Sequence, residues 1–167
     1  MNRLKSYMFI GAGFVFVLGT LLHFAYSWSG NNSFVGLFSP INESTWEHMK
    51  LIFFPMLLYS LFTRKLLKED YPCIYSAFAL GLLLGTFLIP VLFYTYSGIL
   101  GFNVAIVDIA TFFISVIIAF AVVYRTTLSC SVNSFKTVLN FLLFLLTVAF
   151  IIFSVFPPDI AIFKSPI

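Results

Sequence analysis

The sequence predicts an all-α integral membrane protein in which residues 1–167 form a single domain. Of its 167 residues, 61% are hydrophobic and 9% are charged, whereas soluble domains contain about 45–50% apolar and about 25% charged residues. The apolar residues lie in long continuous runs, while a transmembrane β-barrel needs short segments of alternating polarity. The sequence therefore predicts a bundle of helices whose main partner is the lipid bilayer.

Five runs approach the roughly 20 helical residues needed to cross a hydrocarbon core about 30 Å thick. The expected spans are 7–28, 46–62, 74–94, 104–124 and 138–156. The second span is the shortest and holds Pro55, whose ring removes a helical hydrogen bond and predicts a kink. The first run could alternatively be a signal peptide, but its apolar stretch is longer than a signal peptide has. An uncleaved first helix is therefore expected.

The basic residues indicate the orientation, because loops rich in Lys and Arg stay in the cytoplasm. Seven of the nine belong to one end of the expected bundle: Arg3, Lys5, Arg64, Lys65, Lys68, Arg125 and Lys136. With five spans, the N-terminus is then cytoplasmic and the C-terminus external. Cys73 and Cys130 fall at the cytoplasmic, reducing end, where a disulfide is not expected. The net charge of +3 reflects this basic end and calls for no nucleic-acid partner.

The stretch INESTWEHMK, residues 41–50, crowds polar and charged groups against an apolar run. Local helix physics explains part of it. Asn42 or Ser44 can cap the second helix, and Ser44 and Glu47 have the S-x-x-E spacing of a capping box. Trp46 is expected in the aromatic belt at the membrane surface. These residues therefore predict a helix start at the outer membrane surface.

Other ionisable residues fall at the same depth as this helix start. Glu43 and Glu47 share a stripe with Lys50 if the helix starts by Asn42, and Lys50 can neutralise one of the two carboxylates. Helix rise places His23 and Asp108 near the same membrane surface. Ionisable groups inside spans usually face the bundle interior and have partners. The expected polar site comprises His23, Asn42, Glu43, Trp46, Glu47, His48, Lys50 and Asp108.

Four residues of this set are candidate ligands for a divalent metal, Zn or Fe by ligand type. They are His23, Glu47, His48 and Asp108. Their spacing matches neither H-E-x-x-H nor the E-x-x-H step of bundle di-metal sites. Structural roles compete with this one, because His23 can bond a neighbouring helix and Asp108 can act as helix glue. We expect the Asp108 carboxylate to approach His23, His48 or Lys50.

Gly81 and Gly85 have the G-x-x-x-G spacing that lets two helices approach closely. The spacing suits packing within the chain, and it also suits a homo-oligomer.

Three short elements follow one another between residues 28 and 50: WSGNN, GLFSP and NESTWEHMK. They resemble the W-S-G-x-N, G-L-F-x-P and N-E-S-x-W-E-H-x-K elements of a family of small bacterial multi-pass membrane proteins of unknown function. The segment FPPDIAIF is similar to that family's closing segment, which implies that this chain stops early, at Ile167. The resemblance implies a multi-pass protein of the bacterial plasma membrane and supplies no activity.

Two functional hypotheses follow from the sequence. In the first, the outward-facing polar site binds a small ligand or an external protein partner, or it braces the loop before the second helix. The alternative is an intramembrane metal-dependent hydrolase built on the His, Glu and Asp residues. We rank binding or structure above catalysis, because an enzyme needs ligand groups that converge within a few ångströms, whereas a brace needs only caps and ion pairs.

Overall fold

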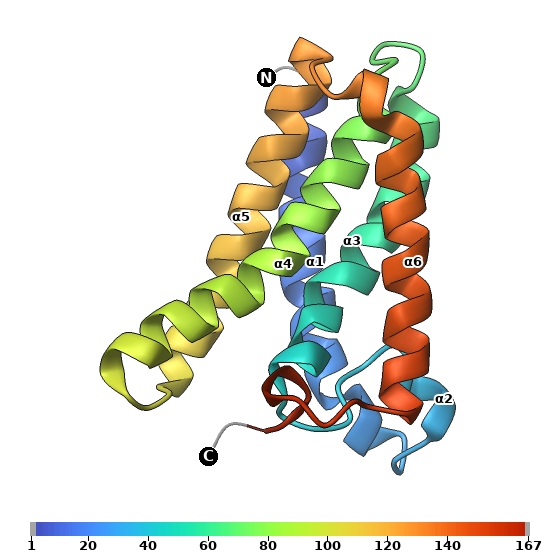
Figure 1. Ribbon diagram of the computed structural model, residues 1–167. Helices are drawn as coiled ribbons and strands as arrows, with labels where there is room; N and C mark the ends of the chain where they lie inside the picture. Colours follow the sequence, from blue (N-terminus) through green and yellow to red (C-terminus); the bar gives the residue numbers. More distant parts are fainter. Residues whose placement is uncertain (1–2, 166–167) are drawn as a thin grey trace.

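The computed structural model describes residues 3–165, which form helices joined by short loops and contain no strand (Figure 1). Five helices are long and three are short. The elements are α1 (Arg3–Trp28), α2 (Ser33–Gly36), α3 (Thr45–Leu67), α4 (Ile74–Leu100), α5 (Ala105–Ser129), η1 (Asn133–Phe135), α6 (Lys136–Val155) and η2 (Ala161–Phe163). The all-α prediction is therefore confirmed for this range.

The long helices run up and down beside one another, so that the beginning of α1 and the end of η2 lie at opposite ends of the bundle (Figure 1). Helix α3 packs against α1 and α4, α5 packs against α4 and α1, and α6 packs against α4. The lower parts of α4 and α5 lean away together from the other helices (Figure 1). The end of the bundle that holds α2 and η2 is therefore built mainly by α1, α3 and α6.

Each long helix covers, to within one residue, the run that predicted it, and most extend further at one end. The largest extension is in α4, which continues to Leu100 and ends at Gly101 in the left-handed conformation, with φ +79°. Glycine adopts this conformation at helix ends without a steric penalty. Helix α6 ends at Val155, just before the Pro157–Pro158 pair, which cannot continue a helix.

Within the described residues, four helical segments are long and apolar enough to cross a membrane: α1, α4, α5 and Asn133–Val155. Helix α3 is also long, but it is the most polar of the five because Glu47, Lys50, Arg64 and Lys65 lie within it. Much of α3 is buried by its neighbours. Large apolar side chains instead cover the outside of the bundle, for example Phe9, Ile117 and Phe144, which are 63%, 57% and 63% exposed.

Gly81 and Gly85 lie on the face of α4 that packs against α5. A Cβ atom at Gly81 would lie 2.4 Å from a methyl carbon of Val123 and 2.9 Å from the carbonyl oxygen of Ala119. A Cβ atom at Gly85 would lie 2.7 Å from the Cβ atom of Ala119. The spacing therefore serves close packing within the chain, and this face of α4 is not free for a second copy.

Replacing Gly81 with alanine should destabilise the bundle by about 1–3 kcal/mol, the usual cost of overpacking a close contact. Gly98 is a matched control, because a Cβ atom there meets nothing within 4 Å. Thermal unfolding in detergent micelles, followed by circular dichroism, measures both variants. Equal melting temperatures for Gly81→Ala and Gly98→Ala would contradict the close packing of Gly81 against α5.

A disulfide joins Cys73, just before α4, to Cys130, just after α5. The expectation that these cysteines stay unpaired was therefore wrong. The expectation rested on the compartment alone, whereas the antiparallel packing of α4 and α5 brings the two Cα atoms to 5.3 Å, within the range that a disulfide requires. The disulfide lies at the end of the bundle that carries most of the basic residues.

Candidate functional site

Ser44 is the N-cap of α3, as the sequence predicted. Its side-chain oxygen accepts a hydrogen bond from the Glu47 amide at 3.3 Å, and its own amide donates to the Asn42 side chain at 2.9 Å. The helix begins at Thr45, so Glu43 lies outside it and not on a helical stripe with Glu47 and Lys50. The capping prediction is therefore confirmed for Ser44, and the stripe prediction was wrong for Glu43.

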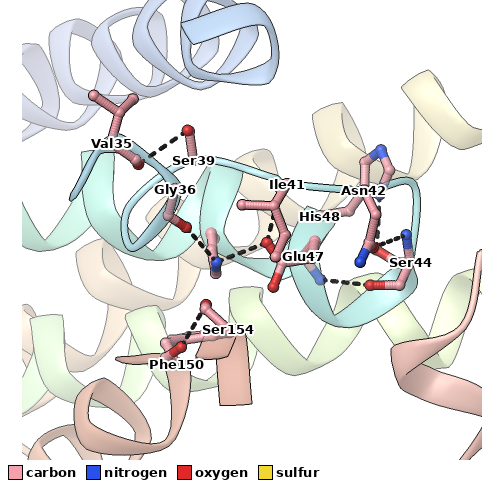
Figure 2. A network of polar contacts seen from close by, with 11 residues as sticks. Val35, Gly36, Ser39, Ile41, Asn42, Ser44, Glu47, His48, Phe150 and Ser154 are labelled. Atoms are coloured by element: carbon pink, nitrogen blue, oxygen red, sulfur yellow. Dashed lines mark hydrogen bonds and ion pairs between the residues drawn. The ribbon is translucent and has the colours of Figure 1, made fainter. Parts of the chain in front are cut away.

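The Glu47 carboxylate and the Lys50 ammonium form a buried ion pair. Their closest atoms are 2.7 Å apart, and the side chains are 3% and 0% exposed. Both groups also bind the loop between α1 and α3, residues 29–44, which contains the short helix α2. Lys50 donates to the Gly36 carbonyl oxygen at the end of α2 at 3.0 Å, and Glu47 accepts from the Ile41 amide at 3.0 Å (Figure 2). We call Glu47 and Lys50 the brace, because together they fasten the loop to α3.

The polar contacts of the brace explain how two charges remain buried. A charge removed from water costs several kcal/mol unless a partner and further hydrogen bonds satisfy it. Here each charged group has the other as partner and has a backbone group of the loop as well. The two charges cancel, so the brace adds no net charge to this end of the bundle.

A second polar group lies beside the brace and is formed by His23 of α1, Glu43 of the loop and His48 of α3. One ligand atom from each of the three side chains lies within 4.8 Å of those from the other two. The rings of His23 and His48 have centroids 5.2 Å apart. We call these residues the His–Glu triad. Two imidazoles and one carboxylate form a recurrent ligand set for Zn²⁺ and Fe²⁺.

His48 is oriented in the way that metal-binding histidines usually are. Its Nδ1 atom lies 2.9 Å from the carbonyl oxygen of Ser44, and a carbonyl oxygen can only accept a hydrogen bond. In the neutral ring, Nδ1 therefore carries the proton and Nε2 carries the free electron pair. Such a second hydrogen bond to a backbone carbonyl fixes the tautomer and ring orientation of metal-ligating histidines.

The spacing within the triad suits a shared cation better than a direct hydrogen bond. The Nε2 atom of His48 and a carboxylate oxygen of Glu43 are 3.4 Å apart, which is long for a charge-assisted hydrogen bond. Two ligand atoms that share a tetrahedral zinc ion, each at about 2.0–2.1 Å, lie about 3.4 Å apart. The His23 Nδ1 atom is buried and has no hydrogen-bond partner among the described residues.

The triad is open to water on the Glu43 side. The Glu43 side chain is 69% exposed and that of His48 is 29% exposed. An ion could therefore enter from solution at the end of the bundle, without passing through the apolar interior. Three protein ligands would also leave one position free for water or an anion.

Asp108 does not belong to either group. It lies in the first turn of α5 and accepts a hydrogen bond from the Tyr96 hydroxyl of α4. Among residues 3–165, its side chain makes no direct hydrogen bond or ion pair with His23, His48 or Lys50, so the direct contact expected from the sequence is absent. The depth argument treated the helices as parallel, whereas α4 and α5 lean away from α1 and α3 at this end (Figure 1).

Trp46 is buried instead of lying in a membrane-surface belt. It is 8% exposed and packs against Phe150, Phe153 and Phe163. The aromatic contacts join α3 to α6 and to η2, so Trp46 holds the C-terminal segment against the start of α3. These contacts could not be anticipated from local sequence, because they link residues more than 100 positions apart.

The sequence analysis did not assign hydrogen-bond partners to Lys50, Glu47 or Asp108 outside the polar site. In the structure these partners are the Gly36 carbonyl, the Ile41 amide and the Tyr96 hydroxyl, respectively. Backbone groups of an irregular loop carry no signal in the sequence. Tyr96 could have been found, because Gly101 marks the end of its helix and the following turn returns the chain toward Asp108. Glu43 was expected in the polar site but not as a metal ligand. Because α3 begins at Thr45, Glu43 lies in the loop, and its carboxylate lies near His23 and His48.

The chain is thus a helical bundle with several membrane-length apolar helices. At one end, a buried ion pair fastens a loop to α3, and a set of metal-ligand residues lies beside it. It belongs to a family of unknown function, DUF6512, whose family model matches residues 1–167. The resemblance to a family of unknown function is therefore confirmed, while the three sequence elements as its signature and a bacterial source remain predictions. No curated protein and no solved structure matches the chain.

Proposed function

We propose that this protein binds one divalent transition-metal ion, of which Zn²⁺ is the best fit, through His23, Glu43 and His48 at one surface of a membrane. The observation that carries the proposal is the convergence of these three side chains from α1, the loop and α3. Two neutral imidazoles and one carboxylate have a net negative charge, which favours a cation. A bound ion would join α1 to the start of α3.

The proposed site replaces part of the ligand set expected from the sequence. Glu43 takes the place of Glu47, because Glu47 is occupied by Lys50 and by the Ile41 amide. Asp108 is bound by Tyr96. We favour metal binding over hydrolysis, because Glu47, the carboxylate next to the site that could act as a general base, is neutralised by Lys50.

Equilibrium dialysis against Zn²⁺ tests the proposal. The detergent-solubilised protein is first stripped with a chelator, and bound zinc is then measured by elemental analysis. We expect one ion per chain in the parent and in Asp108→Asn, and a large loss in Glu43→Gln. The proposal is wrong if Glu43→Gln binds as much zinc as the parent, or if Asp108→Asn loses as much as Glu43→Gln.

The proposal includes five membrane passes in the plasma membrane: the four apolar segments and, in addition, α3. Its 23 residues reach about 35 Å at 1.5 Å per residue, which is enough for the bilayer core. Its position between α1 and α4 shields its polar residues from lipid. An odd number of passes places the two termini on opposite sides.

The basic residues and the disulfide favour opposite orientations. Loops rich in Lys and Arg remain in the cytoplasm, whereas disulfides persist in oxidising compartments. We give precedence to the basic residues, because they act while the helices insert and seven of the nine lie at one end. The proposed orientation has a cytoplasmic N-terminus and an external His–Glu triad.

Cysteine labelling tests this orientation in a Cys73→Ser/Cys130→Ser background. A membrane-impermeant maleimide applied to intact cells should label Lys164→Cys, near η2. It should label Lys68→Cys, at the end of α3, only after the cells are permeabilised. Labelling of Lys68→Cys alone in intact cells would reverse the orientation and place the triad in the cytoplasm, without affecting the metal-binding proposal.

A further inference from the structure

An apolar groove lies between α4 and α6. It has a volume of about 610 Å³, and all nine residues that line it are apolar, seven of them leucine. Leu142 and Leu145 of α6 and Phe87 of α4 are 43%, 46% and 49% exposed. In a membrane, such a groove faces the acyl chains of the lipids.

Two cationic side chains lie at the basic end of this groove. The guanidinium of Arg64 and the ammonium of Lys136 lie 5.0 and 5.4 Å from the centroid of the Tyr75 ring. Lys136 is one helical turn from Leu139 of the groove, and Tyr75 is five residues before Leu80 of the groove. Tyr75 and Lys136 therefore lie next to the apolar groove along α4 and α6, and Arg64 of α3 joins them at the Tyr75 ring.

The pair is not neutralised by a carboxylate. Among residues 3–165, neither Arg64 nor Lys136 forms an ion pair; Arg64 donates to the carbonyl oxygen of Ser60 at 3.2 Å. Asp70, an acidic residue of the loop between α3 and α4, is paired with Arg3 at 2.5 Å. Lys136 is the first residue of α6, so the positive end of that helix dipole lies beside it.

We propose that this surface binds an anionic glycerophospholipid, with the phosphate at Arg64 and Lys136 and one acyl chain in the α4–α6 groove. Basic pockets between transmembrane helices commonly hold anionic headgroups. A zwitterionic lipid would fill the groove equally well, but its own cationic group would offset the attraction to the pair. Selectivity therefore comes from the headgroup, and the position of the lipid comes from the groove.

Native mass spectrometry of the protein from nanodiscs that contain phosphatidylglycerol and phosphatidylcholine tests this proposal. We expect one phosphatidylglycerol to remain bound to the parent chain. Lys136→Gln should weaken its retention about fivefold, the effect of one charge near a membrane surface. Lys65→Gln is the matched control, because it removes the same charge from the same end of the bundle outside the groove.

A second variant tests the groove independently of charge. Leu142→Trp places a large ring in the open part of the groove and leaves both cations in place, so it should also displace the lipid. The proposal is overturned if Lys65→Gln lowers retention as much as Lys136→Gln, which would indicate a general attraction to a basic surface. It is also overturned if phosphatidylcholine is retained equally well, or if Leu142→Trp changes nothing.

Discussion

Replacing Lys50 with methionine is expected to lower the free energy of unfolding by about 3–5 kcal/mol, the cost of leaving one charge of a buried pair without its partner. Methionine fills a similar volume, so the loss comes from the charge. The Glu47 carboxylate would remain buried with only the Ile41 amide as a partner. Unfolding in micelles with a chemical denaturant, followed by tryptophan fluorescence to which the nearby Trp46 contributes, measures the change.

Two further variants separate the brace from a general effect of charge. Glu47→Gln/Lys50→Met removes both charges, and it should be clearly more stable than Lys50→Met alone, because replacing a whole buried pair is often nearly neutral. Lys164→Met breaks an exposed pair with Asp159 and should leave stability unchanged. If Lys50→Met is as stable as Lys164→Met, the brace does not hold the loop.

The second large effect is expected at the triad. His48→Ala should weaken zinc binding by at least about 100-fold, because even the loss of an outer-shell partner costs up to about 100-fold in metal affinity. Zinc should also raise the melting temperature of the parent, because a ligand that binds only the folded state stabilises it. His48→Ala should show no such rise. Calorimetric titration and thermal unfolding measure the two effects.

The pH dependence of zinc affinity tests whether histidines are among the ligands. Protons compete with a metal for imidazole nitrogens, so zinc affinity should fall as the pH is lowered from 7.5 toward 5.5, roughly the range in which histidine titrates. Asp108→Asn should retain both the affinity and its pH dependence. An affinity that is constant across this range would show that the histidines are not the ligands.

The helices were predictable because each depends on a long run of apolar residues that are consecutive in the sequence. Long apolar runs gave five helices within a few residues of their observed positions. The N-cap at Ser44 was also predictable, since a cap depends on its own residue and its near neighbours. Local sequence therefore determined both the elements and the start of α3.

The site was less predictable, because it depends on how the helices lean and where the loop runs. Asp108 was assigned to the polar site from its depth along the helix, but depth does not determine where a residue lies in the plane of the membrane. The burial of Trp46 and the pairing of Cys73 with Cys130 depend on contacts across the bundle. The polar residues divide into a brace and a triad because the Ile41 amide and the Gly36 carbonyl bind Glu47 and Lys50. The positions of these backbone groups cannot be predicted from the sequence.

The most direct measurement is X-ray absorption at the zinc edge on the protein loaded with one equivalent of zinc. The His–Glu triad predicts two imidazole ligands with oxygen donors completing the shell, all at about 2.0–2.1 Å. His48→Ala should lose one imidazole contribution from that spectrum. A shell with sulfur at about 2.3 Å, or a spectrum without imidazole, would contradict zinc binding at His23, Glu43 and His48.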